Sequence, residues 1–367
     1  MADPKLTEGT LYINRDRDFR TGQWGEYVKI GIVRGDRNAA DRNLEHQTGN
    51  PREILTIHEL FSPMVEHLET QLHHRFASYW VHGEWFEMDE ETVDNLVLKE
   101  ASKIIAQQNE SLEDFQAKIE LKDTLSTDSV RAPTNEEQQV AKLCFDAREA
   151  LIIANAKKDI IDAKLRFEIG ENNGIEGVVN LVYKHGSPTF DKTKFIKENQ
   201  ALAEQYMEDR DDKLSGSISL AKAKSLADLD AGLNETLVEA KSNVPNFQPE
   251  LKLTKPRSIS GLQLLHQAYI ETMRDVAEYS WELDRMRARL VRLLGGDKGI
   301  EGIITYNRVM KEQTPAFNST RFKNENPEVY QSYLKDGKES VAVTILPYRA
   351  YPPKEIDFSE YTKTIYD

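Results

Sequence analysis

An internal repeat in the second part of the chain constrains the fold more strongly than any other feature. Residues 163–177, AKLRFEIGENNGIEG, align with residues 288–302, ARLVRLLGGDKGIEG, at an offset of 125 positions. After two inserted residues the register resumes at an offset of 127, where FDKTKF at 190–195 aligns with FNSTRF at 317–322. Two copies of one unit indicate a duplication, because a solenoid needs about three repeats or more.

Both copies carry an apolar stripe at helical spacing, followed by a glycine stop, a short extended piece and a shorter helix. The stripes run through Val140, Leu151, Ile161 and Leu165 in the first copy and through Leu265, Val276, Met286 and Leu290 in the second. We therefore predict a mainly α-helical duplicated region. Its copies either pack on each other about a pseudo-twofold axis or pair between the chains of a homo-oligomer.

The N-terminal part has the shorter period of a β-sheet. Residues 9–14 and 27–33 are rich in Tyr, Ile and Val, and the segment RDRDFRTGQWGE between them predicts a long hairpin loop. A third strand is expected at 53–61, and Ser62 followed by Pro63 is typical of a helix start. This part is therefore predicted to be a small α+β domain, in which a short mixed or antiparallel sheet has flanking helices.

The predicted fold class is thus α+β, with the sheet domain first and the duplicated region after it. The expected segments are the α+β domain at 1–108, a linker at 109–136, the first helical repeat unit at 137–208, a polar connector at 209–258, the second helical repeat unit at 259–346 and an aromatic C-terminal tail at 347–367.

The charge balance restricts the kind of nucleic-acid contact that the chain can make. It has 48 Lys and Arg against 62 Asp and Glu, a formal net charge of -14, which disfavours a protein that coats nucleic acid with its whole surface. Within 12–52, eight basic residues stand against six acidic ones, whereas 53–100 holds two against eleven. Any nucleic-acid contact is therefore expected in the first half of the N-terminal domain.

Cysteine content and hydropathy indicate a cytoplasmic protein. Cys144 is the single cysteine, which excludes an internal disulfide and a cysteine-rich zinc site. The first ten residues, MADPKLTEGT, lack the apolar stretch of a signal peptide, and no apolar run approaches the ~20 residues that a membrane span needs. We predict cytoplasmic localisation and no membrane partner.

Five short blocks in the N-terminal domain occur in a fixed order with regular spacing. They are GTLYI, VKIG, ADRNLEHQTGNP, LETQLHHRF and GEWF, within residues 9–90. In sequence and order these blocks resemble the GIY-YIG nuclease superfamily, in the phage and bacterial branch where Lys-Ile-Gly replaces Tyr-Ile-Gly. The resemblance implies a metal-dependent nuclease domain and does not extend into the repeats.

Carried over position by position, the resemblance implies five catalytic residues. The tyrosine of the first block is Tyr12, the lysine that replaces the second tyrosine is Lys29, and the arginine of the third block is Arg42. The family's metal-binding glutamate falls on Glu69, and His73 matches the histidine one helical turn later. The implied metal ligand is Glu69 and the implied cofactor is Mg²⁺ or Mn²⁺.

The chemistry of phosphodiester hydrolysis is compatible with these residue types. A hard divalent ion takes oxygen ligands, and Mg²⁺ commonly uses only one or two protein carboxylates, so Glu69 alone is a sufficient anchor. The guanidinium of Arg42 would brace the phosphate. Tyr12 would position or deprotonate the attacking water, helped by Lys29 if the ammonium lowers the pKa of the tyrosine.

Each of these residues also has an ordinary structural interpretation. A tyrosine on a short strand usually packs, a lysine or arginine beside a strand or on a polar helix usually faces water, and Glu69 with His73 is a common helix-surface pair. His67, His73 and His74 lie on one helix that is predicted to be solvated, so they cannot all face one zinc ion.

Taken together, the residues and the resemblance predict a divalent-metal-dependent endonuclease that hydrolyses phosphodiester bonds in a phage or anti-phage context; DNA as the substrate in preference to RNA is implied by the resemblance to the family. The repeats are expected to give targeting or assembly. Two alternatives stay open at this level: a catalytically silent nucleic-acid-binding relative, and a structural or interaction protein in which the repeats form oligomers.

Overall fold

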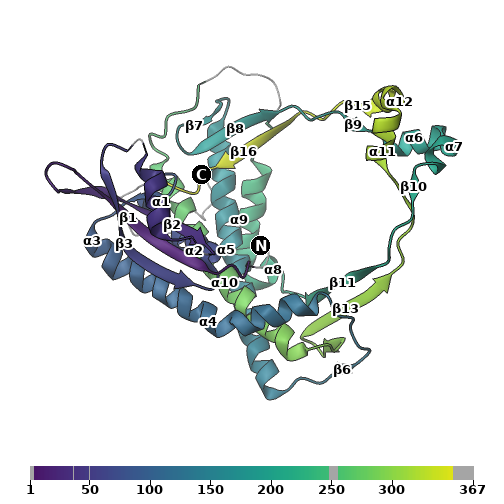
Figure 1. The fold of residues 1–367 in the computed structure, drawn as a ribbon, viewed down its shortest axis with the longest axis horizontal. Helices are drawn as coiled ribbons and strands as arrows, with labels where there is room; N and C mark the ends of the chain where they lie inside the picture. Colours follow the sequence, from purple (N-terminus) through teal and green to yellow (C-terminus); the bar gives the residue numbers. More distant parts are fainter. Residues whose placement is uncertain (1–3, 36, 49, 248–254, 350–367) are drawn as a thin grey trace.

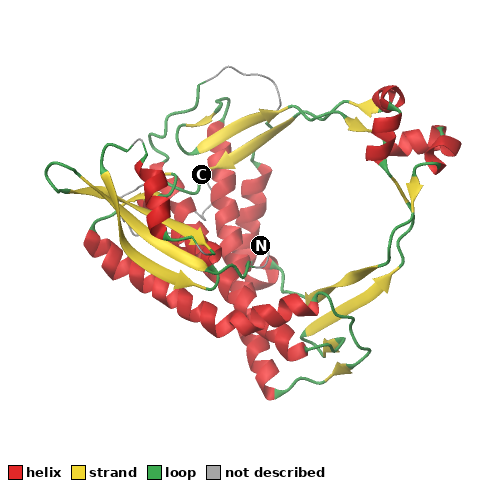
Figure 2. Cartoon of the chain, viewed as in Figure 1, coloured by secondary structure: helices red, strands yellow, loops and turns green. Residues whose placement is uncertain are grey.

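The computed structural model describes residues 4–35, 37–48, 50–247 and 255–349 (Figure 1). An antiparallel sheet with flanking helices comes first, and a helix-rich region follows it (Figure 2). The predicted α+β class is therefore confirmed. In the described part of the chain, none of the helices combines the length and the apolar character that crossing a membrane requires.

The N-terminal sheet has five antiparallel strands in the order β3-β1-β2-β5-β4. Its strands are β1 (Gly9–Arg17), β2 (Trp24–Arg34), β3 (Glu53–Ser62), β4 (Trp80–His82) and β5 (Trp85–Glu87). The predicted hairpin is present, but its strands are longer and its loop shorter than expected. The Asp18 carboxylate closes the loop by accepting the backbone N–H groups of Arg20 and Thr21 at 2.9 and 2.8 Å.

Helices cover both faces of this sheet. Three of them are long enough to pack on it or beside it: α1 (Ala39–Gln47), α2 (Val65–Arg75) and α4 (Leu98–Leu121). Leu11 and Ile13 alternate with Tyr12 along β1, so Leu11 and Ile13 point to one face of the sheet and Tyr12 points to the other. Leu11 and Ile13 join a core with α2 and α4, whereas Tyr12 packs with Ala39 of α1. The face under α1 is therefore a separate environment from the main core.

The 3-10 turn Ala77–Tyr79 joins α2 to β4. Two further short elements, helix α3 (Glu90–Thr92) and the π-helical segment Val93–Val97, connect the sheet to α4. Asp89 caps α3 by accepting the backbone N–H of Thr92 at 2.8 Å.

The linker predicted at 109–136 begins inside a helix, so that boundary was wrong. Helix α4 continues to Leu121 because Phe115 stacks on Trp281 of helix α10 (Gln263–Leu294), with 5.7 Å between ring centroids. Helix α2 also packs on α10, and the side-chain amide of Gln71 donates to the carbonyl of Ala277 at 3.3 Å. Helix α2 is thus largely covered and not solvated as predicted.

The duplicated region repeats one order of elements around two long helices, α5 (Asn135–Ile169) and α10. The first copy continues with β7 (Gly174–Ile175), β8 (Val179–Lys184), β9 (Thr189–Phe190), α6 (Lys192–Glu198), α7 (Gln200–Glu204), β10 (Met207–Glu208) and β11 (Lys213–Leu220). The second continues with β12 (Gly299–Ile300), β13 (Ile304–Lys311), β14 (Ala316–Phe317), α11 (Ser319–Glu325), α12 (Pro327–Ser332), β15 (Leu334–Lys335) and β16 (Ser340–Ile345).

Strands of one copy pair with strands of the other along the length of the repeat. Strand β8 pairs with β16 and β11 with β13, so each two-stranded ribbon holds one strand from each copy. The ribbons lead to a distal module where α6, α7, α11 and α12 share one aromatic core, centred on Phe195 and Phe322. With α5 and α10, which pack on each other, the ribbons and this module close a loop (Figure 1). The copies therefore pack on each other within one chain.

In its described part, the polar connector predicted at 209–258 contains one strand and two helices, and its first part belongs to the first copy. Strand β11 belongs to the first copy, and helices α8 (Leu226–Leu229) and α9 (Ala231–Ser242) follow it. Leu233 and Ala240 of α9 are buried against α5. Within the predicted linker, Val130–Arg131 forms the short strand β6, which pairs in parallel with β12. Most of the tail predicted at 347–367 lies outside the described residues.

Candidate active site

The face of the sheet beneath α1 gathers polar side chains from two strands and from the helix itself. Asn14 of β1, Asn43 of α1 and Thr56 of β3 form a closed hydrogen-bonded triangle with distances of 2.6, 2.6 and 2.9 Å. This triangle fixes α1 on the sheet. The site described below lies where α1, β1 and β2 meet, beside this anchor.

Tyr12 is buried at this junction, with 1% of its surface exposed. It is paired with Gly31 across the β1–β2 ladder, and its ring lies directly over that glycine. A Cβ atom at position 31 would lie 2.5 Å from the Tyr12 hydroxyl oxygen. The glycine of the VKIG block is therefore needed for space, since any side chain there would displace the tyrosine.

Lys29 also points to this face and is 7% exposed. Its ammonium donates to the Glu84 carboxylate at 2.6 Å and lies 3.1 Å from Nε2 of His46 and 5.9 Å from the centre of the Tyr12 ring. Burial and the neighbouring Lys29 charge lower the pKa of His46, so its ring is neutral and Nε2 accepts from the ammonium. Lys29 is thus a buried, charge-paired lysine, and not the water-facing lysine that is usual beside a strand.

Arg42 reaches the site from α1, one turn before His46. Its guanidinium hydrogen-bonds to the Tyr12 hydroxyl and pairs with the Glu45 carboxylate, which also accepts Arg37. The Arg42 side chain is 38% exposed, so a bound anion can reach it from solvent. Arg37 pairs with the same carboxylate, and among the described interactions it does not contact Tyr12, so it is a natural control for Arg42.

The pKa of Tyr12 is raised to about 12, mainly by burial and then by the Glu84 carboxylate, while Arg42 opposes the shift. The expectation that Lys29 lowers the pKa of Tyr12 was wrong. The reason is physical: Glu84 neutralises the lysine, and a buried phenolate is more costly than a phenol. Tyr12 therefore keeps its proton at neutral pH and can orient a water or a phosphate oxygen by hydrogen bonding.

Glu69 and His73 lie one turn apart on α2 and both face the β2 side of the site. His73 donates its Nε2 proton to the Ile30 carbonyl at 3.0 Å, and burial lowers its pKa. Burial and the Glu84 carboxylate raise the pKa of Glu69 to about 7. Among the described residues the Glu69 carboxylate has neither a hydrogen-bond nor an ion-pair partner. It is an available oxygen donor.

The donor set fits a hard divalent ion better than zinc. In the described ranges, no three His, Cys, Asp or Glu side chains converge on one point, as a structural zinc site requires. His67, His73 and His74 point to three different neighbours, namely the Gln108 amide, the Ile30 carbonyl and the Tyr348 ring. An unpaired carboxylate at Glu69 matches the sparse protein coordination of Mg²⁺.

Lys29 and Arg42 lie beside Tyr12, and the Glu69 carboxylate on α2 is near enough to Tyr12 for its charge to raise the pKa of the tyrosine. His73 supports the backbone of β2 beside them. Sequence reasoning missed His46 and Glu84, although both lie within the blocks that carried the resemblance. His46 follows Arg42 by one helical turn, which is the signal that could have identified it.

Comparison with known proteins adds one match. Residues 9–100 match the T5orf172 domain. This domain is associated with nuclease-type proteins, so a nuclease-like or nucleic-acid-related role is supported for that part of the chain. The match begins at the first residue of β1, contains every residue of the site above and ends in α4. No curated protein and no solved structure is significantly similar to the chain.

Proposed function

We propose that the N-terminal domain is a GIY-YIG-like, divalent-metal-dependent endonuclease that hydrolyses phosphodiester bonds in DNA, in a phage or anti-phage context. The observation that carries the proposal is the convergence of two cations, a buried tyrosine and an unpaired carboxylate at one end of the sheet. The T5orf172 match over the same residues supports it.

In this proposal Glu69 holds Mg²⁺ or Mn²⁺ through its free carboxylate. When bound, such an ion supplies charge neutralisation at the phosphate and lowers the pKa of a coordinated water. Glu69, whose pKa is about 7, would give up its proton on ligating the ion. Glu84, which already binds Lys29 on the same side, adds negative potential that favours a cation there.

The other residues act on the phosphate. Arg42 exchanges its exposed pairing with Glu45 for a phosphate oxygen, because a guanidinium fork matches that geometry. Tyr12, held by Arg42 and still protonated, orients the reacting oxygen. Lys29 stabilises the charge that develops in the transition state, and His73 keeps β2, and with it Lys29, in position through the Ile30 carbonyl.

The duplicated region is proposed to target or assemble this nuclease. Among the described residues of the repeats, no three His, Cys, Asp or Glu side chains are grouped so that they could hold a metal ion. Their distal module projects on two ribbons away from the sheet domain (Figure 1), so it can contact a second region of a long substrate or another protein.

The test is a comparison of two variants on the same helix. Glu69→Gln removes the free carboxylate, whereas Glu66→Gln removes a surface carboxylate that pairs with Lys5 and Arg34. On a labelled linear DNA duplex with Mg²⁺ or Mn²⁺, cleavage should be lost in Glu69→Gln and kept within a few-fold in Glu66→Gln. Equal activity of the two variants contradicts the proposal, and inactivity of every form including the natural chain points to the silent nucleic-acid-binding relative.

A further inference from the structure

A pocket of about 270 Å³ lies next to the proposed active site and has no role in the mechanism above. Tyr27 and Trp85 line it. Tyr27 is two residues before Lys29 on β2, so both side chains point to the same face about 7 Å apart. Trp85 is the β5 partner of Lys29 and follows Glu84 directly. The pocket therefore lies roughly one nucleotide away from the lysine proposed to act on the phosphate.

The wall of the pocket is aromatic and accessible. Tyr27 is 41% exposed and Val81 39% exposed, which is unusual for large apolar side chains on a sheet that has a closed core on its other face. Trp85 is half-buried beside them. An exposed tyrosine and a tryptophan at one small pocket form a surface on which a flat ring can stack.

The polar end of the pocket contains a buried carboxylate that is only half satisfied. Asp16 is 7% exposed, and its Oδ2 accepts from the Arg52 guanidinium. In the part of the chain that the structure describes, Oδ1 of Asp16 is buried and has no hydrogen-bond partner. Arg52 is held in turn by the Gln23 carbonyl at 3.1 Å. Oδ1 packs against Gly25, so a ligand in the pocket meets the Asp16 carboxylate beside Oδ2 and Arg52, and a carboxylate at this end is suited to a ligand that brings an N–H group.

We propose that this pocket binds an unstacked nucleobase beside the scissile phosphate, with Asp16 accepting a hydrogen bond from the exocyclic amino group of the base. This inference rests on the proposed function, since it assigns the base that neighbours the cleaved bond. The volume suits one base, and the two aromatic side chains supply the stacking that replaces the neighbouring bases.

The carboxylate sets the expected preference. A carboxylate accepts from the amino group of an unpaired cytosine, adenine or guanine, whereas an unpaired thymine offers only its N3–H, which lies between two carbonyl oxygens that repel the carboxylate. The pocket should therefore discriminate against thymine. The Arg52 guanidinium does not compensate by donating to a thymine carbonyl, because it already donates to Asp16 and to the Gln23 carbonyl.

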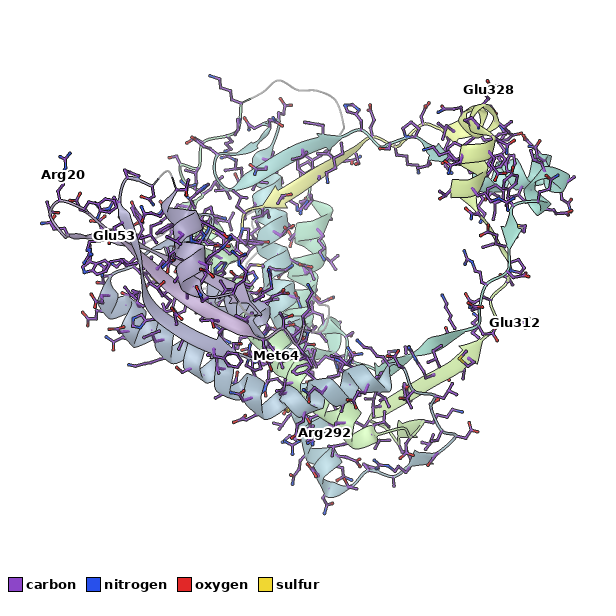
Figure 3. The ribbon with its side chains drawn as sticks, in the orientation of Figure 1. Arg20, Glu53, Met64, Arg292, Glu312 and Glu328 are labelled. Atoms are coloured by element: carbon purple, nitrogen blue, oxygen red, sulfur yellow. The ribbon has the colours of Figure 1, made fainter. Side chains whose placement is uncertain are left out.

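The hairpin next to the pocket can hold the strand whose base is bound. Its loop carries the exposed Phe19, and Arg20 at the tip extends into solvent (Figure 3). Trp24, at the start of β2, is 40% exposed and lies 5.5 Å from the guanidinium groups of Arg15 and Arg17, which alternate with Asp16 and so lie on the face of the hairpin opposite to the pocket. Aromatic and basic side chains together are the usual surface for single-stranded nucleic acid.

The experiment measures binding of fluorescent oligodeoxynucleotides to the full-length chain, in chelator so that no cleavage occurs. The probes are homopolymers of dC, dA and dT of equal length. Tyr27→Ala should weaken dC and dA binding by about 5- to 100-fold, the effect of removing one base-stacking side chain. Tyr279→Ala, which removes an equally exposed tyrosine (39%) from α10, should leave binding unchanged.

Specificity is the second readout. The natural chain should prefer dC and dA over dT by about 10-fold or more, and Asp16→Asn should reduce that preference to within about 3-fold, because an amide can donate to a thymine carbonyl as well as accept. Unchanged binding by Tyr27→Ala, equal affinity of the natural chain for the three probes, or the absence of binding overturns the inference. If the Asp16 variant does not fold, Tyr27→Ala decides by itself.

The outcomes also separate this inference from the proposed function. Base preference that depends on Tyr27 in a protein that never cleaves DNA leaves the pocket intact and refutes the nuclease proposal. Metal-dependent cleavage that is lost in Glu69→Gln, together with base preference that neither Tyr27→Ala nor Asp16→Asn changes, refutes the pocket alone.

Discussion

Replacing Glu69 by glutamine should stabilise the fold at alkaline pH while it abolishes the proposed chemistry. The carboxylate is buried near Glu84 and has no hydrogen-bond partner among the described residues, and these surroundings raise its pKa from 4.5 to about 7. Below pH 4.5 the group is protonated in both the folded and unfolded chains and has no effect on stability. As the pH rises to 7 and above, the folded chain must ionise a buried group, and stability is lost.

The size of this loss follows from the shift. A difference of roughly 2.5 pH units corresponds to about 3 kcal/mol at about 1.4 kcal/mol per unit, and partial exposure to water and salt reduces it to about 1–2 kcal/mol. Glutamine keeps the shape and cannot ionise. The difference in unfolding free energy between Glu69→Gln and the natural chain should therefore be near zero at pH 4.5 and reach about 1–2 kcal/mol at pH 8.

Urea unfolding in chelator measures this difference when it is followed by the fluorescence of the tryptophans in the sheet domain. Glu66→Gln is the matched control, because Lys5 and Arg34 lower the pKa of Glu66 and its removal should destabilise slightly at pH 8. Added Mn²⁺ should restore stability to the natural chain alone. A Glu69→Gln effect that does not change with pH, or that has the opposite sign at pH 8, refutes the electrostatic description of the site.

Four further outcomes are expected. Arg42→Ala should slow cleavage by ~10² or more, whereas Arg37→Ala should change the rate only a few-fold. Single-turnover rates measure both. Similar losses in the two variants would mean that Arg42 acts only through Glu45. Tyr12→Phe and Lys29→Met should each slow cleavage. Tyr12→Phe should leave the shape of the pH–rate profile unchanged up to pH 10, because the Tyr12 phenol, with a pKa of about 12, is still protonated there. A shift of the alkaline limb in Tyr12→Phe would mean that Tyr12 acts as a base. At low Mg²⁺ the rate should rise with pH through about 7 as Glu69 loses its proton, and higher Mg²⁺ should move that rise to lower pH. Phe322→Ala should lower the unfolding free energy of the distal module by about 3–5 kcal/mol, because this fully buried ring lies in a core that both copies share. A loss below 1 kcal/mol in calorimetry would contradict that packing.

The fold was predictable where a pattern is local. The β1–β2 hairpin and the element order of each copy follow from alternation, glycine stops and the repeated FDKTKF and FNSTRF segments. The pairing of β8 with β16 was not predictable, because it joins residues more than 150 positions apart and each strand alone is only a short apolar run.

The boundary between the sheet domain and the repeats shows the same limit. Composition at 109–136 is polar, yet α4 continues because Phe115 has an aromatic partner in Trp281, which no local signal reveals. A fragment that ends near residue 110 loses that contact and the cover that α10 gives to α2. We therefore expect it to fold less stably than a domain of its length normally would.

The site was predictable in its residue types and less so in its electrostatics. The sequence blocks identify Tyr12, Lys29, Arg42 and Glu69, and the fold gathers them from α1, α2 and the β1–β2 hairpin. The raised pKa of Tyr12 was not predictable, since it depends on burial under α1 and on Glu84, which reaches Lys29 only after β5 pairs with β2. Charge pairs that form only when distant segments come together in the fold cannot be predicted from the local sequence.

Metal-dependent nicking of supercoiled plasmid DNA by the full-length chain tests the central claim most directly. The proposal predicts conversion to open-circular DNA with Mg²⁺ or Mn²⁺, loss of conversion when chelator is added, and its return when the metal is restored in excess. Glu69→Gln at the same concentration should give none of these changes, and Glu66→Gln should give all of them. Nicking that persists in chelator, or that Glu69→Gln retains, contradicts the assignment of this site as a divalent-metal-dependent phosphodiesterase.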